Sequence, residues 1–116
     1  MSRHLLVTSA FVVVTVAALA PDARATPITI VGTSDLHGRV DRIPVVAADV
    51  AAVRAELKKQ GGAVVWLDGG DLFQGTVESN SVEGKSVVDG MNAAGLDAAA
   101  IGNHEFGYGP VGPSVI

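Results

Sequence analysis

The chain has 116 residues, a formal net charge of −4 at neutral pH and no Cys. This length allows at most one small domain. The acidic balance argues against a nucleic-acid partner, because binding to phosphate backbones requires clustered Lys and Arg that displace counterions. The lack of Cys excludes disulfides, thiolate metal sites and cysteine nucleophiles, so carboxylate, amide and imidazole groups would have to hold any metal.

Residues 1–25 have the form of a secretory signal peptide. A short basic start precedes an apolar run over residues 5–20, and Ala23 and Ala25 form an A-x-A cleavage site. We expect cleavage after Ala25 and a secreted or bacterial periplasmic location. A retained membrane anchor is the alternative, but the run is shorter than the roughly 20 residues that span a bilayer. We therefore expect no permanent membrane span in the mature segment, residues 26–116.

The mature segment alternates between apolar strands and amphipathic helices. Short strands are predicted at residues 28–31, 63–67 and 98–101, each followed by Gly and polar residues. The order strand, helix, strand, helix, strand is typical of a parallel sheet with right-handed crossovers. The predicted fold class is α/β, with an incomplete β-α-β-α-β architecture. We expect this piece alone to be inactive and marginally folded, because its apolar sheet face would lack cover. That face is expected to include Val31, Val65 and Ile101.

Two helices are predicted between the strands. The first has Asp41 as its cap and Gly61 as its left-handed end. The second has Val87, Val88, Met91 and Ala94 at helical spacing and stops at Gly95. The expected apolar face of the first helix comprises Ile43, Val46, Val50, Val53 and Leu57, and its polar face Asp49, Arg54, Glu56, Lys58 and Lys59.

Clusters of polar residues follow all three predicted strands. Asp35 and His37 follow the first strand, Asp71 the second, and Asn103 and His104 the third. The carboxyl ends of parallel strands share one sheet edge, so these residues are expected to converge. Each residue alone is explained as a turn or cap residue, but their joint occurrence favours a metal site. Oxygen and imidazole donors suit zinc, manganese or iron.

These motifs resemble those of a known family. Asp35-Leu36-His37, Gly70-Asp71 and Gly102-Asn103-His104-Glu105 are similar to the first three signature motifs of the calcineurin-like metallophosphoesterases. The longer stretches 70–76 and 102–106 resemble the secreted 5'-nucleotidase and 2',3'-cyclic-nucleotide phosphodiesterase branch. The resemblance covers residues 28 to about 108, and it implies the N-terminal part of a metallophosphoesterase sandwich.

The resemblance also implies roles for individual residues. Asp35 and His37 would bind the first of two divalent metal ions, Asp71 would bridge both ions, and Asn103 would bind the second. His104 would stabilise the transition state or protonate the leaving oxygen. The implied activity is hydrolysis of a phosphoester, with a small nucleotide as substrate and metal-activated water as the nucleophile.

Two departures from the family pattern leave alternatives open. The family adds three His from later motifs, and this sequence has no His after residue 104. The nucleotidase branch has an Asp that orients the catalytic imidazole where this chain has Gly107. We expect a slower reaction, because the direction and tautomer of the ring are then less fixed. The alternatives are the same chemistry on a sugar phosphate, nucleotide-sugar or sulfur-oxyanion ester, or a catalytically incomplete remnant that binds metal or nucleotide.

Overall fold

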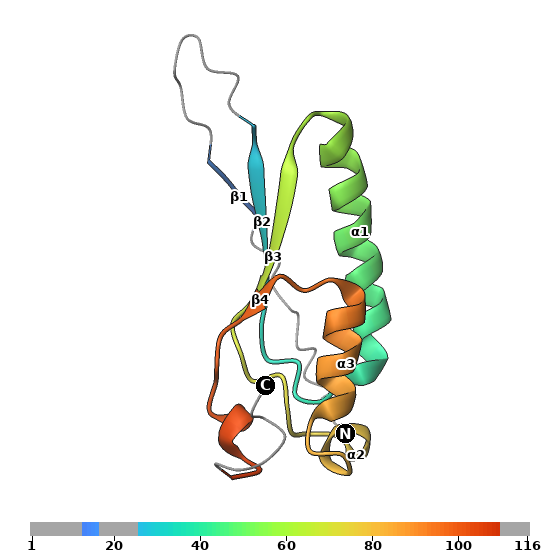
Figure 1. Cartoon of the computed structure of the whole chain (residues 1–116), viewed down its shortest axis with the longest axis vertical. Helices are drawn as coiled ribbons and strands as arrows, with labels where there is room; N and C mark the ends of the chain where they lie inside the picture. Colours follow the sequence, from blue (N-terminus) through green and yellow to red (C-terminus); the bar gives the residue numbers. More distant parts are fainter. Residues whose placement is uncertain (1–12, 17–25, 110–116) are drawn as a thin grey trace, which may run out of the picture.

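A computed structural model describes residues 13–16 and 26–109 of the chain. Within these residues, four strands form one sheet in the order β1-β2-β3-β4 (Figure 1). The strands are β1 (Val13–Val16), β2 (Ile28–Thr33), β3 (Ala63–Asp68) and β4 (Ala98–Ala99). β2, β3 and β4 are parallel, which confirms the predicted α/β fold class.

The antiparallel strand β1 was not expected from the sequence. It pairs with β2 from Val13 opposite Val31 to Val16 opposite Ile28, and it lies within the predicted signal segment. The predicted cleavage site after Ala25 lies outside the described residues, so removal of this segment remains a prediction.

Helices cover one face of the sheet. The helical elements are α1 (Ile43–Lys59), α2 (Val77–Asn80) and α3 (Lys85–Ala94), together with the 3-10 turns η1 (Val40–Arg42) and η2 (His104–Phe106). Figure 1 shows α1, in green, and α3, in orange, side by side on the same side of the sheet. Among the described residues, no helix has the length and apolar character needed to cross a membrane.

The hydrophobic core lies between this sheet face and the two helices. Trp66 of β3 is completely buried, and its ring N–H donates to the Thr33 hydroxyl at 3.0 Å. A buried indole needs such a partner, because an unpaired donor would lose its hydrogen bond to water. The buried apolar residues are Val31, Ile43, Val50, Trp66, Leu72, Phe73, Val87 and Met91.

The opposite sheet face is apolar and exposed. Ile28, Ile30 and Leu67 expose 51%, 42% and 37% of their surface. Side chains alternate between the two faces of a strand, so Val31 points the other way and is 1% exposed. The expectation that Val31 belongs to the uncovered face was therefore wrong. Ile101 is 73% exposed, but it lies beyond the end of β4 and is not part of the sheet.

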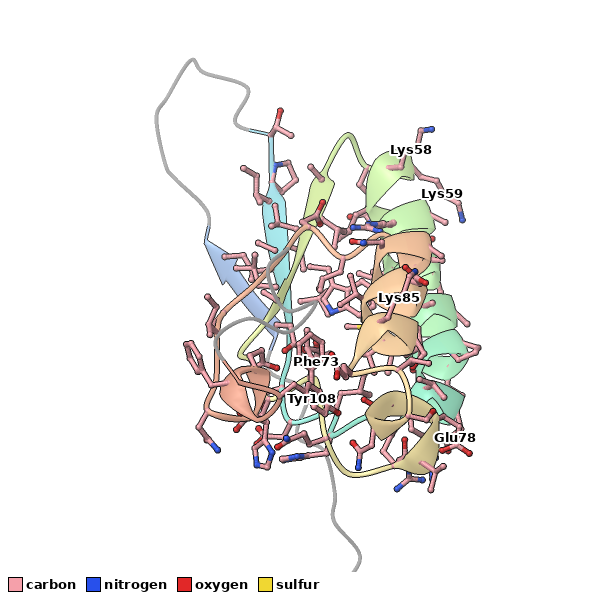
Figure 2. All side chains as sticks on the ribbon, turned by 60° about the horizontal axis from the view of Figure 1, so that its bottom comes forward. Lys58, Lys59, Phe73, Glu78, Lys85 and Tyr108 are labelled. Atoms are coloured by element: carbon pink, nitrogen blue, oxygen red, sulfur yellow. The ribbon has the colours of Figure 1, made fainter. Side chains whose placement is uncertain are left out.

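The two ends of α1 differ in how well the sequence predicted them. Asp41 does not cap the helix, because Arg42 occupies the N-cap position and Asp41 lies one residue earlier, within η1. The Asp41 carboxylate instead pairs with Arg39 at 3.0 Å and Arg42 at 3.3 Å. At the other end, Lys58 and Lys59 occupy the last turn, and Figure 2 shows them projecting away from the body of the molecule. Gly61 follows in the left-handed conformation with φ of +73°, as predicted.

Arg54 also departs from the predicted solvent-facing side of α1. Its guanidinium donates to the Gly95 carbonyl at 2.9 Å and to the Asp97 carboxylate at 2.8 Å. The same carboxylate accepts from the backbone N–H of Trp66 at 2.8 Å. Arg54 therefore joins α1 to the turn that leads from α3 into β4.

Candidate metal centre

The parallel strands bring three loops to one edge of the sheet. Thr33, the last residue of β2, is paired with Asp68, the last residue of β3, and Asp68 is also paired with Ala99. Backbone hydrogen bonds continue from this edge into the first two loops. The N–H of Asp35 donates to the Gly70 carbonyl at 3.0 Å, and the N–H of His37 donates to the Asp71 carbonyl at 3.0 Å. The N–H of Gly38 donates to the Leu72 carbonyl at 2.8 Å. The loops that carry Asp35, His37 and Asp71 are therefore held directly against each other.

Glu105 ties the third loop to the second. Its buried carboxylate accepts hydrogen bonds from the backbone N–H groups of Asp71 at 2.9 Å, Leu72 at 2.6 Å and Gly102 at 2.6 Å. Hydrogen bonds to an ionised acceptor are roughly twice as strong as neutral ones. Glu105 belongs to the Gly-Asn-His-Glu motif, but this role of its carboxylate was not predicted from the sequence.

Asp71 and His104 are also in direct contact. The backbone N–H of His104 donates to Asp71 Oδ1 at 2.9 Å. Gly102 permits this approach, because a Cβ at that position would overlap the Asp71 carboxylate and lie 2.6 Å from the Asp71 backbone nitrogen. A larger residue at position 102 would push the second and third loops apart.

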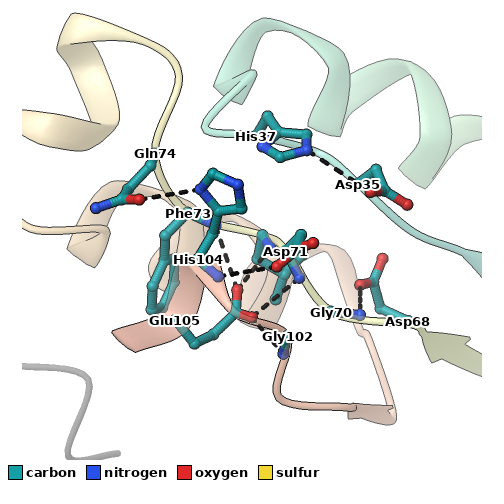
Figure 3. Close-up of polar contacts among 11 residues, drawn as sticks. Asp35, His37, Asp68, Gly70, Asp71, Phe73, Gln74, Gly102, His104 and Glu105 are labelled. Carbon is teal, nitrogen blue, oxygen red and sulfur yellow. Dashed lines mark hydrogen bonds and ion pairs between the residues drawn. The ribbon is translucent and has the colours of Figure 1, made fainter. Parts of the chain in front are cut away.

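Three potential ligands converge at this edge (Figure 3). One ligand atom from each of His37, Asp71 and His104 lies within 4.8 Å of the other two. Asp35 is beside this group, with its Oδ1 3.6 Å from His37 Nε2. Asn103 is exposed and immediately precedes η2. The structure thus brings Asp35, His37, Asp71 and His104 to one region, whereas none of the described side-chain contacts joins Asn103 to them.

The backbone at the site is unusual. Asp35, His37, Asp71 and Gln74 have φ values of 58°, 48°, 57° and 57°. Only a few per cent of non-Gly residues have positive φ, with Asp and His more tolerant than most. Sparsely populated conformations cluster at functional sites, because the surrounding contacts must hold them in place. The hydrogen bonds between the loops provide such contacts.

Asp68, at the end of β3, is a buried carboxyl group beside the site. Burial raises the pKa of Asp68, and the charges of Glu105 and Asp35 act in the same direction. The Thr33 hydroxyl at 2.6 Å and the Gly70 N–H at 2.8 Å oppose the shift. Burial is thus the main cause of the raised pKa of Asp68, and the nearby carboxyl groups of Glu105 and Asp35 make a smaller contribution.

The imidazole of His104 has a side-chain partner that the sequence analysis missed. Its Nδ1 lies 2.9 Å from Gln74 Oε1, and its ring meets that of His37 edge-on with centroids 4.6 Å apart. Gln74 thus gives the ring a hydrogen-bond partner that the sequence did not predict, and the slower reaction expected with Gly107 stays a prediction. No signal in the sequence alone pairs Gln74 with a residue 30 positions away.

The donor chemistry fits a divalent metal. Imidazole and carboxylate groups suit zinc, manganese or iron, and their ligand atoms already lie close enough together to share one ion. An α/β sheet with such a cluster at the carboxyl ends of its strands defines a candidate metal-dependent enzyme site.

The chain belongs to the calcineurin-like phosphoesterase family, whose sequence profile matches residues 28–114. It is 37% identical over 109 residues to a snake venom 5'-nucleotidase of Gloydius brevicauda, covering 83% of this chain and 18% of the relative. It is 40% identical over 86 residues to protein UshA of Escherichia coli and 38% identical over 86 residues to a 5'-nucleotidase of Vibrio cholerae. Each of these two alignments covers 68% of this chain and 16% of the relative. The chain thus spans less than a fifth of the length of these curated relatives.

Proposed function

We propose that the protein containing this chain hydrolyses phosphoesters with two divalent metal ions, and that its substrates are nucleotides. The observation that carries the proposal is the convergence of two proposed ligands, His37 and Asp71, with the proposed proton donor, His104. One donor atom from each of these side chains lies within 4.8 Å of the other two. Family membership supports phosphoester hydrolysis, and the 5'-nucleotidases among the relatives support nucleotides as substrates.

The proposed roles divide the site residues into ligands and a proton donor. Asp35 and His37 would hold the first ion, Asp71 would bridge, and Asn103 would hold the second. Divalent ions supply Lewis-acid polarisation of phosphoryl oxygens and make water a nucleophile at neutral pH. With one ring nitrogen held by Gln74, His104 offers a single nitrogen to the site, and we assign that nitrogen to the leaving oxygen.

A substrate panel tests this function in the full-length protein. We expect hydrolysis of AMP to exceed that of sugar phosphates, nucleotide-sugars and sulfate esters. EDTA should abolish the activity, and zinc, manganese or iron should restore it. Faster turnover of another ester would support the alternative substrates, and metal binding without hydrolysis of any ester would support the incomplete remnant.

Asp71→Asn tests the site itself. The change removes a negative charge from the proposed bridge, so we expect kcat to fall at least about 100-fold. Asp49→Asn is the matched control, because Asp49 is exposed on α1. Equal activity of the two variants would contradict the proposal.

The proposed location is outside the cytoplasm, in the periplasm or the medium. The apolar run and the small residues Ala23 and Ala25 motivate this proposal. N-terminal sequencing of the exported protein should begin at Thr26. An intact Met1 on the exported protein would contradict it.

A further inference from the structure

Gln74 is the one side chain that holds the ring of His104 in place within the described hydrogen bonds. Gln74 Oε1 lies 2.9 Å from His104 Nδ1, and Figure 3 shows the ring between Gln74 on one side and His37 on the other. A carbonyl oxygen can only accept a hydrogen bond, so Nδ1 must carry the proton. We infer that Gln74 is a positioning residue that fixes the Nδ1–H tautomer of His104 and leaves Nε2 to act on the substrate.

The backbone around Gln74 directs its amide toward the ring. Gln74 has a φ of 57°, which is unusual for a residue without a short polar side chain. The next residue, Gly75, has a φ of +137°, and a Cβ there would overlap the carbonyl of His37. The turn that carries the amide is therefore packed against the loop that carries His37. This contact fixes the backbone position from which the Gln74 side chain extends.

Gly107 provides the space that the amide occupies. A Cβ at position 107 would overlap the Gln74 amide group. Gly107 itself has ordinary right-handed angles, with φ of −65° and ψ of −19°, so Ala would adopt this backbone without strain. A substitution at position 107 therefore acts on His104 through the displaced amide of Gln74.

An amide suits a ring that donates a proton during the reaction. This step depends on the proposed function, in which the Nε2–H bond breaks as the leaving oxygen gains the proton. The Nδ1–H bond stays intact throughout, so the Gln74 oxygen accepts the same hydrogen bond before and after the transfer. The ring direction is thus preserved without any rearrangement of Gln74.

The tautomer can be measured without any activity. In the full-length, metal-free protein labelled with nitrogen-15 in the imidazole rings, the His104 signals should report the Nδ1–H tautomer at a pH where the ring is neutral. The signals that are missing from the spectrum of the His104→Gln variant are assigned to His104. Gln74→Leu, which removes the acceptor, should shift the population toward Nε2–H. An unchanged tautomer in Gln74→Leu would overturn the inference, whether or not the protein hydrolyses phosphoesters.

Kinetics supply the second test. We expect Gln74→Leu to lower kcat about 10-fold or more with KM and metal content within twofold of wild type, as for loss of a partner that orients a functional imidazole. Gln74→Glu retains an acceptor oxygen and should keep most of the activity. Equal loss in both variants would contradict a positioning role, and melting temperatures would identify any variant that fails to fold.

A double substitution isolates the role of Gly107. Gly107→Ala should lower kcat in the wild-type background but have little further effect when combined with Gln74→Ala, because the displaced group is then absent. Additive losses would show that Gly107 acts independently of Gln74 and would overturn this part of the inference. A wild-type protein without activity would refute the proposed function, while the tautomer measurement would still decide the role of Gln74.

Discussion

The backbone N–H of His104 donates a hydrogen bond to Asp71 Oδ1 at 2.9 Å. The main chain of His104, the proposed proton donor, is therefore joined to the side chain of Asp71, the proposed bridging ligand. A change that moves the third loop must also move the carboxylate of Asp71. Coupling of this kind makes the site sensitive to substitutions that touch neither metal nor substrate.

Gly102→Ala should show this sensitivity. The new methyl group would overlap the Asp71 carboxylate, and overpacking of this kind typically costs about 1–3 kcal/mol. We expect kcat to fall at least about tenfold, because a small misplacement of reacting groups is costly. Gly32→Ala is the control, since a Cβ at that position has no neighbour within 4 Å. Equal kinetics of the two variants would argue against close packing of these loops.

Glu105→Gln should destabilise the site and the fold together. The amide retains one acceptor oxygen but presents an NH₂ group toward backbone donors that the carboxylate now satisfies. Loss of hydrogen bonds to a buried charged group costs about 1.5–3 kcal/mol. Denaturant unfolding measures this loss, and metal titration should show weaker binding. The exposed Glu78 on α2 provides the matched Glu78→Gln control, for which we expect wild-type values.

Asp68 should make the metal-free protein less stable as the pH rises. Burial raises the pKa of Asp68 above the ordinary value of 3.8. Between these two values the folded state binds more protons than the unfolded state, so the free energy of unfolding decreases with pH. The stabilising contribution is complete below pH 3.8 and is lost above the raised pKa. Asp68→Asn should flatten this part of the profile, as measured by denaturant unfolding at several pH values. The same profile in wild type and variant would contradict the shift.

Metal removal should lower the melting temperature of the full-length protein. A ligand that binds only the folded state adds about 2.7 kcal/mol at a concentration 100 times its Kd. We expect EDTA to lower the melting temperature and added metal to restore it. Asp71→Asn should respond much less, because the proposed bridge is impaired. A full EDTA response in that variant would place the metal elsewhere.

Sequence patterns predicted the parallel sheet and the meeting of its loops at one edge. Strands followed by Gly and polar residues placed Asp35 and Asp71 on neighbouring loops, because parallel strands end at one edge. Gly95 ends α3 in the left-handed conformation with φ of +82°, as expected. These features depend on local residue preferences and on the chain order of the strands, both of which are visible in a sequence.

Features that depend on distant contacts were missed. Asp41 was expected to cap α1, but the chain forms η1 over this residue, Arg42 becomes the N-cap, and the Asp41 carboxylate pairs with Arg39 and Arg42. The roles of Glu105 and Gln74 depend on partners about 30 residues away. Backbone N–H groups are present at every residue except Pro, so no sequence pattern identifies the ones that a buried carboxylate will contact.

The backbone hydrogen bonds from Asp35, His37 and Gly38 to the second loop have a consequence for the dynamics of the site. Surface loops usually open at little cost, and their amide protons exchange rapidly with solvent. These three amides instead continue the pairing of β2 with β3 beyond the end of the sheet. Their exchange should therefore follow the opening of the strands, so that the geometry of the ligands persists for as long as the sheet itself stays closed.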